Sequence, residues 1–188
     1  MKFALDLLQG AGIAAAVGIR PLLPVLLVGA LASADLGLDF SGTDFAFLEA
    51  WPFILGAVVV LAAIEFGSRR TNVGYVLAAV SIVLGALYGA GSLADHDYTI
   101  VPGVIVGAAA AALGFFAALS LFTRVRQRLD AEAASTLPLY GEGAAGASAG
   151  LSVLFPPLAI LILGGLGWLL AGGRRRAGEK YAGLRILR

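Results

Sequence analysis

The chain has 188 residues, of which 60% are hydrophobic and 13% are charged, and its mean hydropathy is +0.93. Soluble proteins carry about a quarter charged residues, so this composition excludes an ordinary soluble domain and predicts one integral membrane domain over the whole chain. The net charge of +1 argues against a nucleic-acid partner, and the absence of cysteine excludes disulfides and thiolate chemistry. Arginine far outnumbers lysine, a bias typical of GC-rich bacterial genes, so we expect a bacterial inner-membrane protein.

The first apolar run covers residues 3–33 and contains Gly18-Ile19-Arg20-Pro21-Leu22-Leu23-Pro24 near its middle. As one straight helix it would be about 45 Å long, whereas the hydrocarbon core of a bilayer is about 30 Å thick. Arginine is costly in a bilayer and proline removes a helix hydrogen bond, so we expect a broken helix that holds Arg20 at depth. The run is then either a kinked crossing or a re-entrant hairpin of two half-helices. A cleavable secretory signal fits less well, because the residues before Arg20 are apolar and include Asp6.

Three full transmembrane helices are predicted next, at Trp51–Phe66, 73–93 and 100–123. An acidic connection without basic residues, 34–50, precedes the first of them. Small residues recur every four positions in the second and third, which predicts close helix contacts within the chain or between subunits, and hence a homo-oligomer. These small residues are Ser81, Gly85 and Gly89 in the second helix, and Gly103, Gly107 and Ala111 in the third.

The last apolar run, 143–172, again exceeds a simple span and contains Phe155-Pro156-Pro157 in its middle. A polar, arginine-rich connection at 124–142 precedes it, and a basic tail at 174–188 follows it. Arginine-rich loops stay on the cytoplasmic side, so a single crossing would put the tail on the wrong side. We therefore predict that the run enters from the cytoplasm, turns at the two prolines and returns. The tail would then be cytoplasmic and close to anionic lipids.

The two interrupted runs share a faint pattern, because Gly18-Ile19 with Leu22-Leu23-Pro24 matches Gly150-Leu151 with Leu154-Phe155-Pro156 at identical spacing. Broken helices recur in corresponding positions of transporter halves, although chance matches are common in segments of this composition. The predicted fold class is an all-α integral membrane protein with three full transmembrane helices and two long proline-broken segments.

Arg20 is the main candidate for a ligand contact. A guanidinium together with the free N–H groups of a half-helix N-terminus can hold a carboxylate, a phosphate or a halide. The alternative is a structural arginine bonded to backbone carbonyls or to an acid. Glu65 is either a proton or cation relay or a helix-end residue neutralised by a nearby arginine. The predicted binding set is Gly18, Arg20, Pro21, Pro24, Glu65, Ser152, Pro156 and Pro157.

His96 is the only histidine and stands between Asp95 and Asp97. A stable metal site needs three or four converging ligands, so we expect this loop to be solvated and predict no metal and no cofactor. Asp6 is expected simply to lie near a membrane interface. No serine or threonine has a histidine base in a recognisable motif, so we do not expect an enzyme.

Four features together resemble a bacterial inner-membrane family catalogued as domain of unknown function 4126. They are the segment around Arg20, the acidic connection, Glu65 and the closing Lys180-Tyr181-Ala182-Gly183-Leu184-Arg185. The resemblance implies a small polytopic membrane protein without an established activity. The chain departs from the family after Glu65, where Ser68-Arg69 stands in place of the usual Asp-Lys pair. We expect a transporter or channel for a small anion or an anionic lipid headgroup; the alternative is a membrane scaffold whose broken helices serve packing.

Overall fold

The computed structural model describes residues 2–66 and 73–182, and every regular element in this part of the chain is a helix. The elements are α1 (Lys2–Ile19), α2 (Leu22–Ala32), the short 3-10 helix η1 (Ala46–Leu48), α3 (Trp51–Phe66), α4 (Val73–Ala94), α5 (Val101–Arg126), α6 (Ala131–Leu154) and α7 (Leu158–Ala182). The all-α prediction is confirmed for the described residues.

Three of the described helices are long and apolar enough to cross a membrane, namely α1, α4 and α5. Two of them match predicted spans. The third was expected at Trp51–Phe66, where α3 forms with the predicted bounds but has only 16 residues. The apolar helix α1 takes its place, because the long first run is divided at Arg20 and leaves 18 residues on its N-terminal side.

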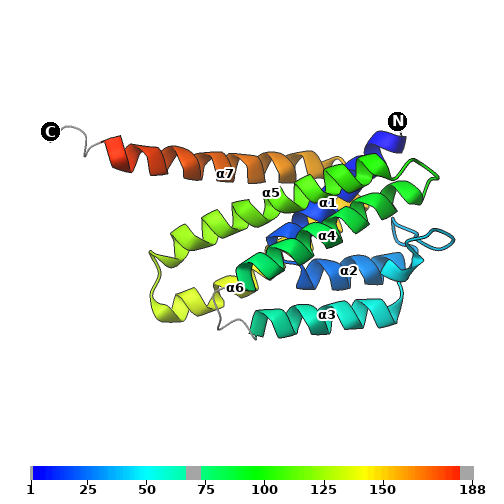
Figure 1. Ribbon diagram of the computed structural model, residues 1–188, viewed down its shortest axis with the longest axis horizontal. Helices are drawn as coiled ribbons and strands as arrows, with labels where there is room; N and C mark the ends of the chain where they lie inside the picture. The colour runs from blue at the N-terminus through cyan, green and yellow to red at the C-terminus, as the bar shows by residue number, and fades with distance from the viewer. Residues whose placement is uncertain (1, 67–72, 183–188) are drawn as a thin grey trace.

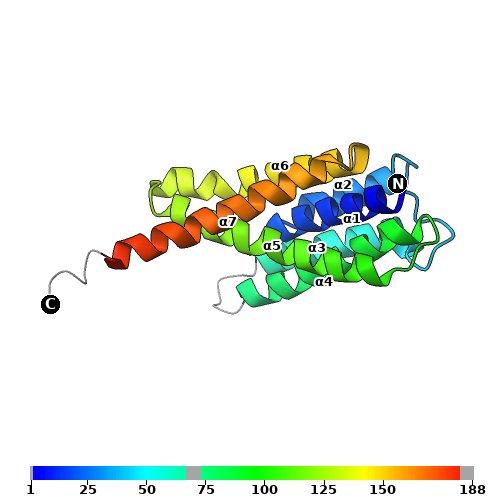
Figure 2. The same cartoon turned by 90° about the horizontal axis from the view of Figure 1, so that it is seen from above.

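The helices run alternately between the two ends of an elongated bundle, as Figures 1 and 2 show. Helix α1 is central and contacts α4, α5, α6 and α7. Every residue from Gln9 to Gly18 is buried, and most of them are glycine or alanine. Small side chains on all sides allow four helices to approach one central helix closely.

The glycines of α4 and α5 bring the two backbones together. A Cβ on Gly89 would meet the carbonyl oxygen of Gly103, and a Cβ on Gly107 would meet the carbonyl oxygen of Gly85. The predicted close contact between these helices is therefore confirmed, and it lies within one chain. The small-residue faces on which the homo-oligomer prediction rested are already used inside the bundle.

The interruption of the first run lies at Arg20-Pro21. The N–H of Arg20 still donates to the carbonyl of Ala16 at 3.2 Å, after which α2 begins at Leu22 and returns along the bundle. Pro24 does not break a helix, because it lies in the first turn of α2, where no N–H has an intrahelical acceptor.

The polar connection predicted at 124–142 is mostly helical, which corrects the sequence prediction. Helix α5 continues to Arg126, and α6 already begins at Ala131. The carboxylate of Asp130 accepts the N–H of Ala133 at 2.8 Å and caps α6. An apolar run marks only the part of a helix that faces lipid or core. The start of α6 that was predicted from the apolar run was therefore too late. Helix α6 ends at Leu154, and α7 begins at Leu158 after the two prolines.

The two ends of the bundle differ in charge. One end, called the basic end, carries Arg124, Arg126 and Arg128 around the α5–α6 connection, on the side of the C-terminus (Figure 1). The opposite, acidic end carries the α2–α3 and α4–α5 connections near the N-terminus. Its acidic residues include Asp35, Asp39, Asp44, Glu49, Asp95 and Asp97.

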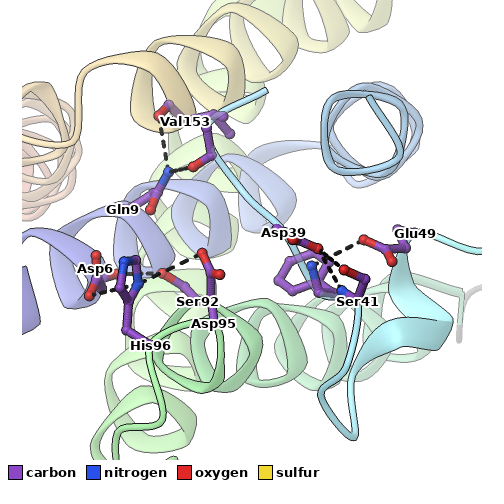
Figure 3. Close-up of polar contacts among 11 residues, drawn as sticks. Asp6, Gln9, Asp39, Ser41, Glu49, Ser92, Asp95, His96 and Val153 are labelled. Atoms are coloured by element: carbon purple, nitrogen blue, oxygen red, sulfur yellow. Dashed lines mark hydrogen bonds and ion pairs between the residues drawn. The ribbon is translucent and has the colours of Figure 1, made fainter. Parts of the chain in front are cut away.

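A single glutamine ties three elements together near the acidic end. The side-chain amide of Gln9 donates to the carbonyl of Gly37 at 2.7 Å and to the carbonyl of Val153 at 3.0 Å. Figure 3 shows the amide of α1 between the α2–α3 connection and the last turn of α6. These bonds fix where the turn between α6 and α7 lies along the bundle.

Candidate functional site

A cavity of about 790 Å³ lies beyond the last turn of the central helix. Helix α1 stops at Ile19, whereas its neighbours continue toward the basic end. Gly18 lies against Ala111, so the 15 residues from there to Arg126 extend α5 by about 22 Å past this level. The turn between α1 and α2 forms the floor of the cavity. The walls come from α4 (Gly74, Leu77, Ser81), α5 (Phe115, Ala118, Leu119, Phe122, Arg126) and α6 (Ser135, Pro138, Leu139, Glu142).

Arg20 lies at the edge between this cavity and a second one. Its side chain is half-buried, and its guanidinium carbon lies 5.7 Å from the centre of the Phe122 ring, a distance that suits a cation–π contact. The second cavity has a volume of about 420 Å³ and is lined by Arg20, Leu119, Phe122, Thr123, Arg126 and Gln127. Two guanidinium groups are thus shared by both cavities.

Glu142 occupies the N-terminus of α2, which corrects the expectation that free N–H groups there receive a ligand. Its Oε2 accepts the N–H of Leu23 at 3.0 Å. A carboxylate is favourable at this position, because the N-terminus of a helix carries partial positive charge. The lining of the larger cavity holds Arg20, Arg126 and Glu142 as its charged residues, so its formal charge is +1.

Ser81 brings a polar group into the otherwise apolar wall on α4. Its side chain is fully buried, and within the described part of the chain its Oγ has no hydrogen-bond partner. A buried hydroxyl without a partner is costly, so such a group usually meets a ligand or a water molecule.

Of the seven predicted binding residues whose side chains the structure describes, three line the cavity: Gly18, Arg20 and Pro21. Pro24 is buried elsewhere in α2, and the side chain of Glu65 lies outside the described part of the structure. Ser152 faces the side of α1 at Gly12, two turns before Arg20, and its Oγ donates to the carbonyl of Ser148 at 2.8 Å. Pro156 and Pro157 lie in the α6–α7 turn, which α6 carries to the acidic end (Figure 2). The structure does not bring Ser152, Pro156 or Pro157 to Arg20.

Known proteins give no guide to the ligand of this cavity. No family model, curated protein or solved structure matches the chain. A concave, mostly apolar pocket with a few convergent polar groups is the usual form of a ligand site.

Arg126, Phe122 and Glu142 are cavity residues that the sequence analysis missed. Their helical spacing was a usable pattern, because residues three or four apart share one face. Phe115, Leu119, Phe122 and Arg126 follow this spacing on α5, as do Ser135, Pro138 or Leu139, and Glu142 on α6. The second pattern was overlooked because the start of α6 was taken for a connection.

The acidic end contains a second polar cluster, which Figure 3 shows in detail. Asp6 is only 7% exposed, and its Oδ2 lies 3.4 Å from Nδ1 of His96. The same nitrogen lies 3.8 Å from a carboxylate oxygen of Asp95, and the hydroxyl of Ser92 donates to the backbone carbonyl of Asp6 at 2.6 Å. Asp6 is therefore buried against this loop at the end of the bundle, where the sequence predicted only a position near a membrane interface. Among the described residues no group of three or more ligand-type side chains could hold a metal ion.

Replacing Asp95 by asparagine is expected to make the protein relatively more stable as the pH rises. Burial raises the pKa of this carboxyl, and the nearby His96 only partly opposes the shift. A carboxyl with a raised pKa contributes stability below its unfolded pKa of about 3.9, and that contribution is lost as the pH rises through the folded pKa. Thermal melting from pH 4 to pH 7 in detergent should therefore show a growing advantage of Asp95→Asn. An equal difference at every pH would contradict this assignment.

Proposed function

We propose that the protein is a membrane transporter for a small anion or an anionic lipid headgroup, and that the anion binds between Arg20 and Arg126. The observation that carries this proposal is the cavity beyond α1, whose apolar walls hold two guanidinium groups and one carboxylate. Guanidinium groups form strong, often paired hydrogen bonds with carboxylates and phosphates. Arg20 is half-buried beside the Phe122 ring, which strengthens its contact with an anion, whereas Arg126 is exposed and adds its charge at the mouth of the site.

The charge difference between the two ends supports a defined orientation. Basic connections stay in the cytoplasm, so the basic end and the C-terminus are cytoplasmic in our proposal. The described helices alternate in direction from α1 to α7, so the N-terminus is on the opposite side (Figure 1). The cavity then opens toward the cytoplasmic half of an inner membrane. Helices α6 and α7 form a hairpin whose turn reaches the acidic end, which is the outer end in this orientation.

Glu142 acts in this proposal as a resident anion. Its carboxylate already neutralises part of the positive charge around the end of α2, so it competes electrostatically with an incoming anion. Its presence near the site makes binding reversible, which transport requires. Removing its charge should therefore strengthen anion binding and slow release.

Replacing Arg20 by glutamine is expected to lower anion flux about tenfold to a hundredfold, because a hydrogen bond to a charged group contributes about 1.5–3 kcal/mol. Uptake of radiolabelled phosphate and acetate, and movement of a fluorescent phosphatidylglycerol between leaflets, would be measured in proteoliposomes. Glu142→Gln should lower the apparent KM, because the amide oxygen still accepts the N–H of Leu23 while the negative charge is gone.

Arg128→Gln is the matched control for the flux measurements. Arg128 is exposed at the basic end and does not line the cavity, so its replacement should change flux by less than about twofold. The anion site would be refuted if the wild type transports one of the three probes and Arg20→Gln transports that probe at the same rate.

A membrane scaffold is the second candidate, and the contact between Arg20 and the Phe122 ring favours it. An arginine stacked on an aromatic ring can serve mainly to fix α5 against the α1–α2 turn. In that case Arg20→Gln should lower the melting temperature or change the size of the particle in detergent, and the wild type should show no anion flux.

A further inference from the structure

We infer that the anion carries a hydrocarbon chain, so that the site takes a long-chain amphiphilic anion. Its carboxylate or phosphate would lie between Arg20 and Arg126, and its chain would lie in the larger cavity. This inference rests on the proposed anion site and narrows its ligand to one chemical class. A free long-chain acid and an anionic membrane lipid share this chemistry.

The two adjoining cavities differ in character, as the two ends of an amphiphile do. The smaller one combines both arginines with the polar side chains of Thr123 and Gln127. The larger one adds a mainly apolar set that includes Leu77, Phe115, Ala118 and Leu139, together with three polar residues, Ser81, Ser135 and Glu142. Arg20, Leu119, Phe122 and Arg126 border both cavities, so the charged groups stand where the polar and apolar parts meet.

The volume of the larger cavity suits a chain better than a single inorganic ion. Pockets of about 300–1,000 Å³ hold organic ligands of drug size, and this cavity has about 790 Å³. An inorganic ion at the arginines would leave the aromatic and aliphatic walls without a partner. A chain would fill them, and for an acid taken up from water each methylene group moved into the cavity strengthens binding about fourfold.

The walls of the larger cavity also reach the outer surface of the bundle. Leu119 on α5 and Leu139 on α6 both line the cavity, yet they are 52% and 75% exposed. In the proposed orientation these exposed leucines would face lipid chains, so that the cavity would border the hydrocarbon region. An amphiphile can therefore enter sideways from the leaflet while its headgroup stays near the basic end. The buried hydroxyl of Ser81 gives the ligand or its bound water one further polar contact.

Binding of carboxylates of increasing chain length tests this inference. Wild type, Arg20→Gln, Ala118→Phe and Ala109→Phe would each be incubated with acetate, octanoate or hexadecanoate in a non-ionic detergent, and bound anions would be counted by native mass spectrometry. Ala118 lines the larger cavity, whereas Ala109 is exposed on the same helix and is the matched control. Ratios between proteins at one micelle concentration cancel the partition of the probe into detergent.

We expect Ala118→Phe to reduce hexadecanoate binding at least tenfold and Ala109→Phe to leave it within twofold, while Arg20→Gln weakens binding of all three probes. Should Ala118→Phe fail to fold, Ser135→Phe places a ring in the same cavity from an exposed position on α6. Equal binding of acetate and hexadecanoate, both lowered by Arg20→Gln and neither by the added ring, would overturn the amphiphile and leave the anion site standing. Hexadecanoate binding that is insensitive to Arg20→Gln would overturn the anion site itself.

Nanodiscs of phosphatidylcholine with added phosphatidylglycerol distinguish the two sources of the amphiphile. Retention of phosphatidylglycerol that depends on both Arg20 and the free space at Ala118 would identify a membrane lipid. Retention of hexadecanoate alone with that dependence would identify a single-chain acid. Either result supports the inference. The inference is contradicted if Arg20→Gln and Ala118→Phe each retain phosphatidylglycerol and hexadecanoate as well as the wild type does.

Discussion

Replacing Gly89 by leucine is expected to prevent α4 and α5 from packing and to leave little folded protein. A Cβ at this position would meet the carbonyl oxygen of Gly103, which belongs to helix backbone and cannot rotate away. Overpacking a core costs about 1–3 kcal/mol when side chains can adjust, and the cost is larger here because a backbone must move. Since folded proteins are stable by only about 5–15 kcal/mol, we expect a loss of more than about 3 kcal/mol.

Thermal melting by circular dichroism and the yield of monodisperse protein in detergent would measure this effect. Gly56→Leu on α3 and Gly164→Leu on α7 are matched controls, because a Cβ at either glycine meets nothing within 4 Å. Gly89→Ala should give a smaller loss in the same direction. A melting temperature of Gly89→Leu close to that of the controls would show that α4 and α5 do not pack as described.

Replacing Gln9 by methionine is expected to destabilise the protein by about 2–4 kcal/mol, because a buried acceptor that loses its donor costs about 1–3 kcal/mol. Methionine has a similar shape but no N–H, so the carbonyls of Gly37 and Val153 would lose the hydrogen bonds at 2.7 and 3.0 Å. Gln9→Glu should be worse, since a carboxylate would face two carbonyl oxygens.

The control for this pair is Gln127→Met, at an exposed residue just after α5. Melting curves of the four proteins in the same detergent would rank them, with Gln9→Glu lowest and Gln127→Met closest to wild type. If Gln9→Met melted with the wild type, the amide would not hold α1, the α2–α3 connection and α6 together. Hydrogen exchange at Leu36, whose N–H donates to the carbonyl of Leu31 at 3.0 Å beside this contact, should also increase in Gln9→Met and not in Gln127→Met.

The positions of the helices followed largely from local chemistry. Hydropathy and composition predicted an all-α chain, and Pro21 beside Arg20 predicted where the first run is divided, because proline cannot donate the hydrogen bond that would continue α1. Glycines every four residues predicted the close contact of α4 and α5. The start of α6 was missed because Asp130 caps a helix whose first half is polar, and an apolar run does not extend over such a segment.

The site depended on contacts between residues far apart in the chain. Glu142 meets the N–H of Leu23, a residue 119 positions away, and His96 meets Asp6 across 90 positions. Neither contact produces a pattern that can be recognised in a single sequence. The predicted binding set placed Pro156 and Pro157 with Arg20, but the length of α6 carries them to the opposite end of the bundle.

By itself, the sequence determined that this chain is helical and apolar, that its first run is interrupted at Arg20-Pro21, and that its charges divide into acidic and basic connections. These properties depend on each residue and its near neighbours. The tertiary structure decided that α1 is the central helix and that its neighbours extend beyond its end. The cavity arises because the central helix ends before the helices around it, and packing alone decides which helices surround α1.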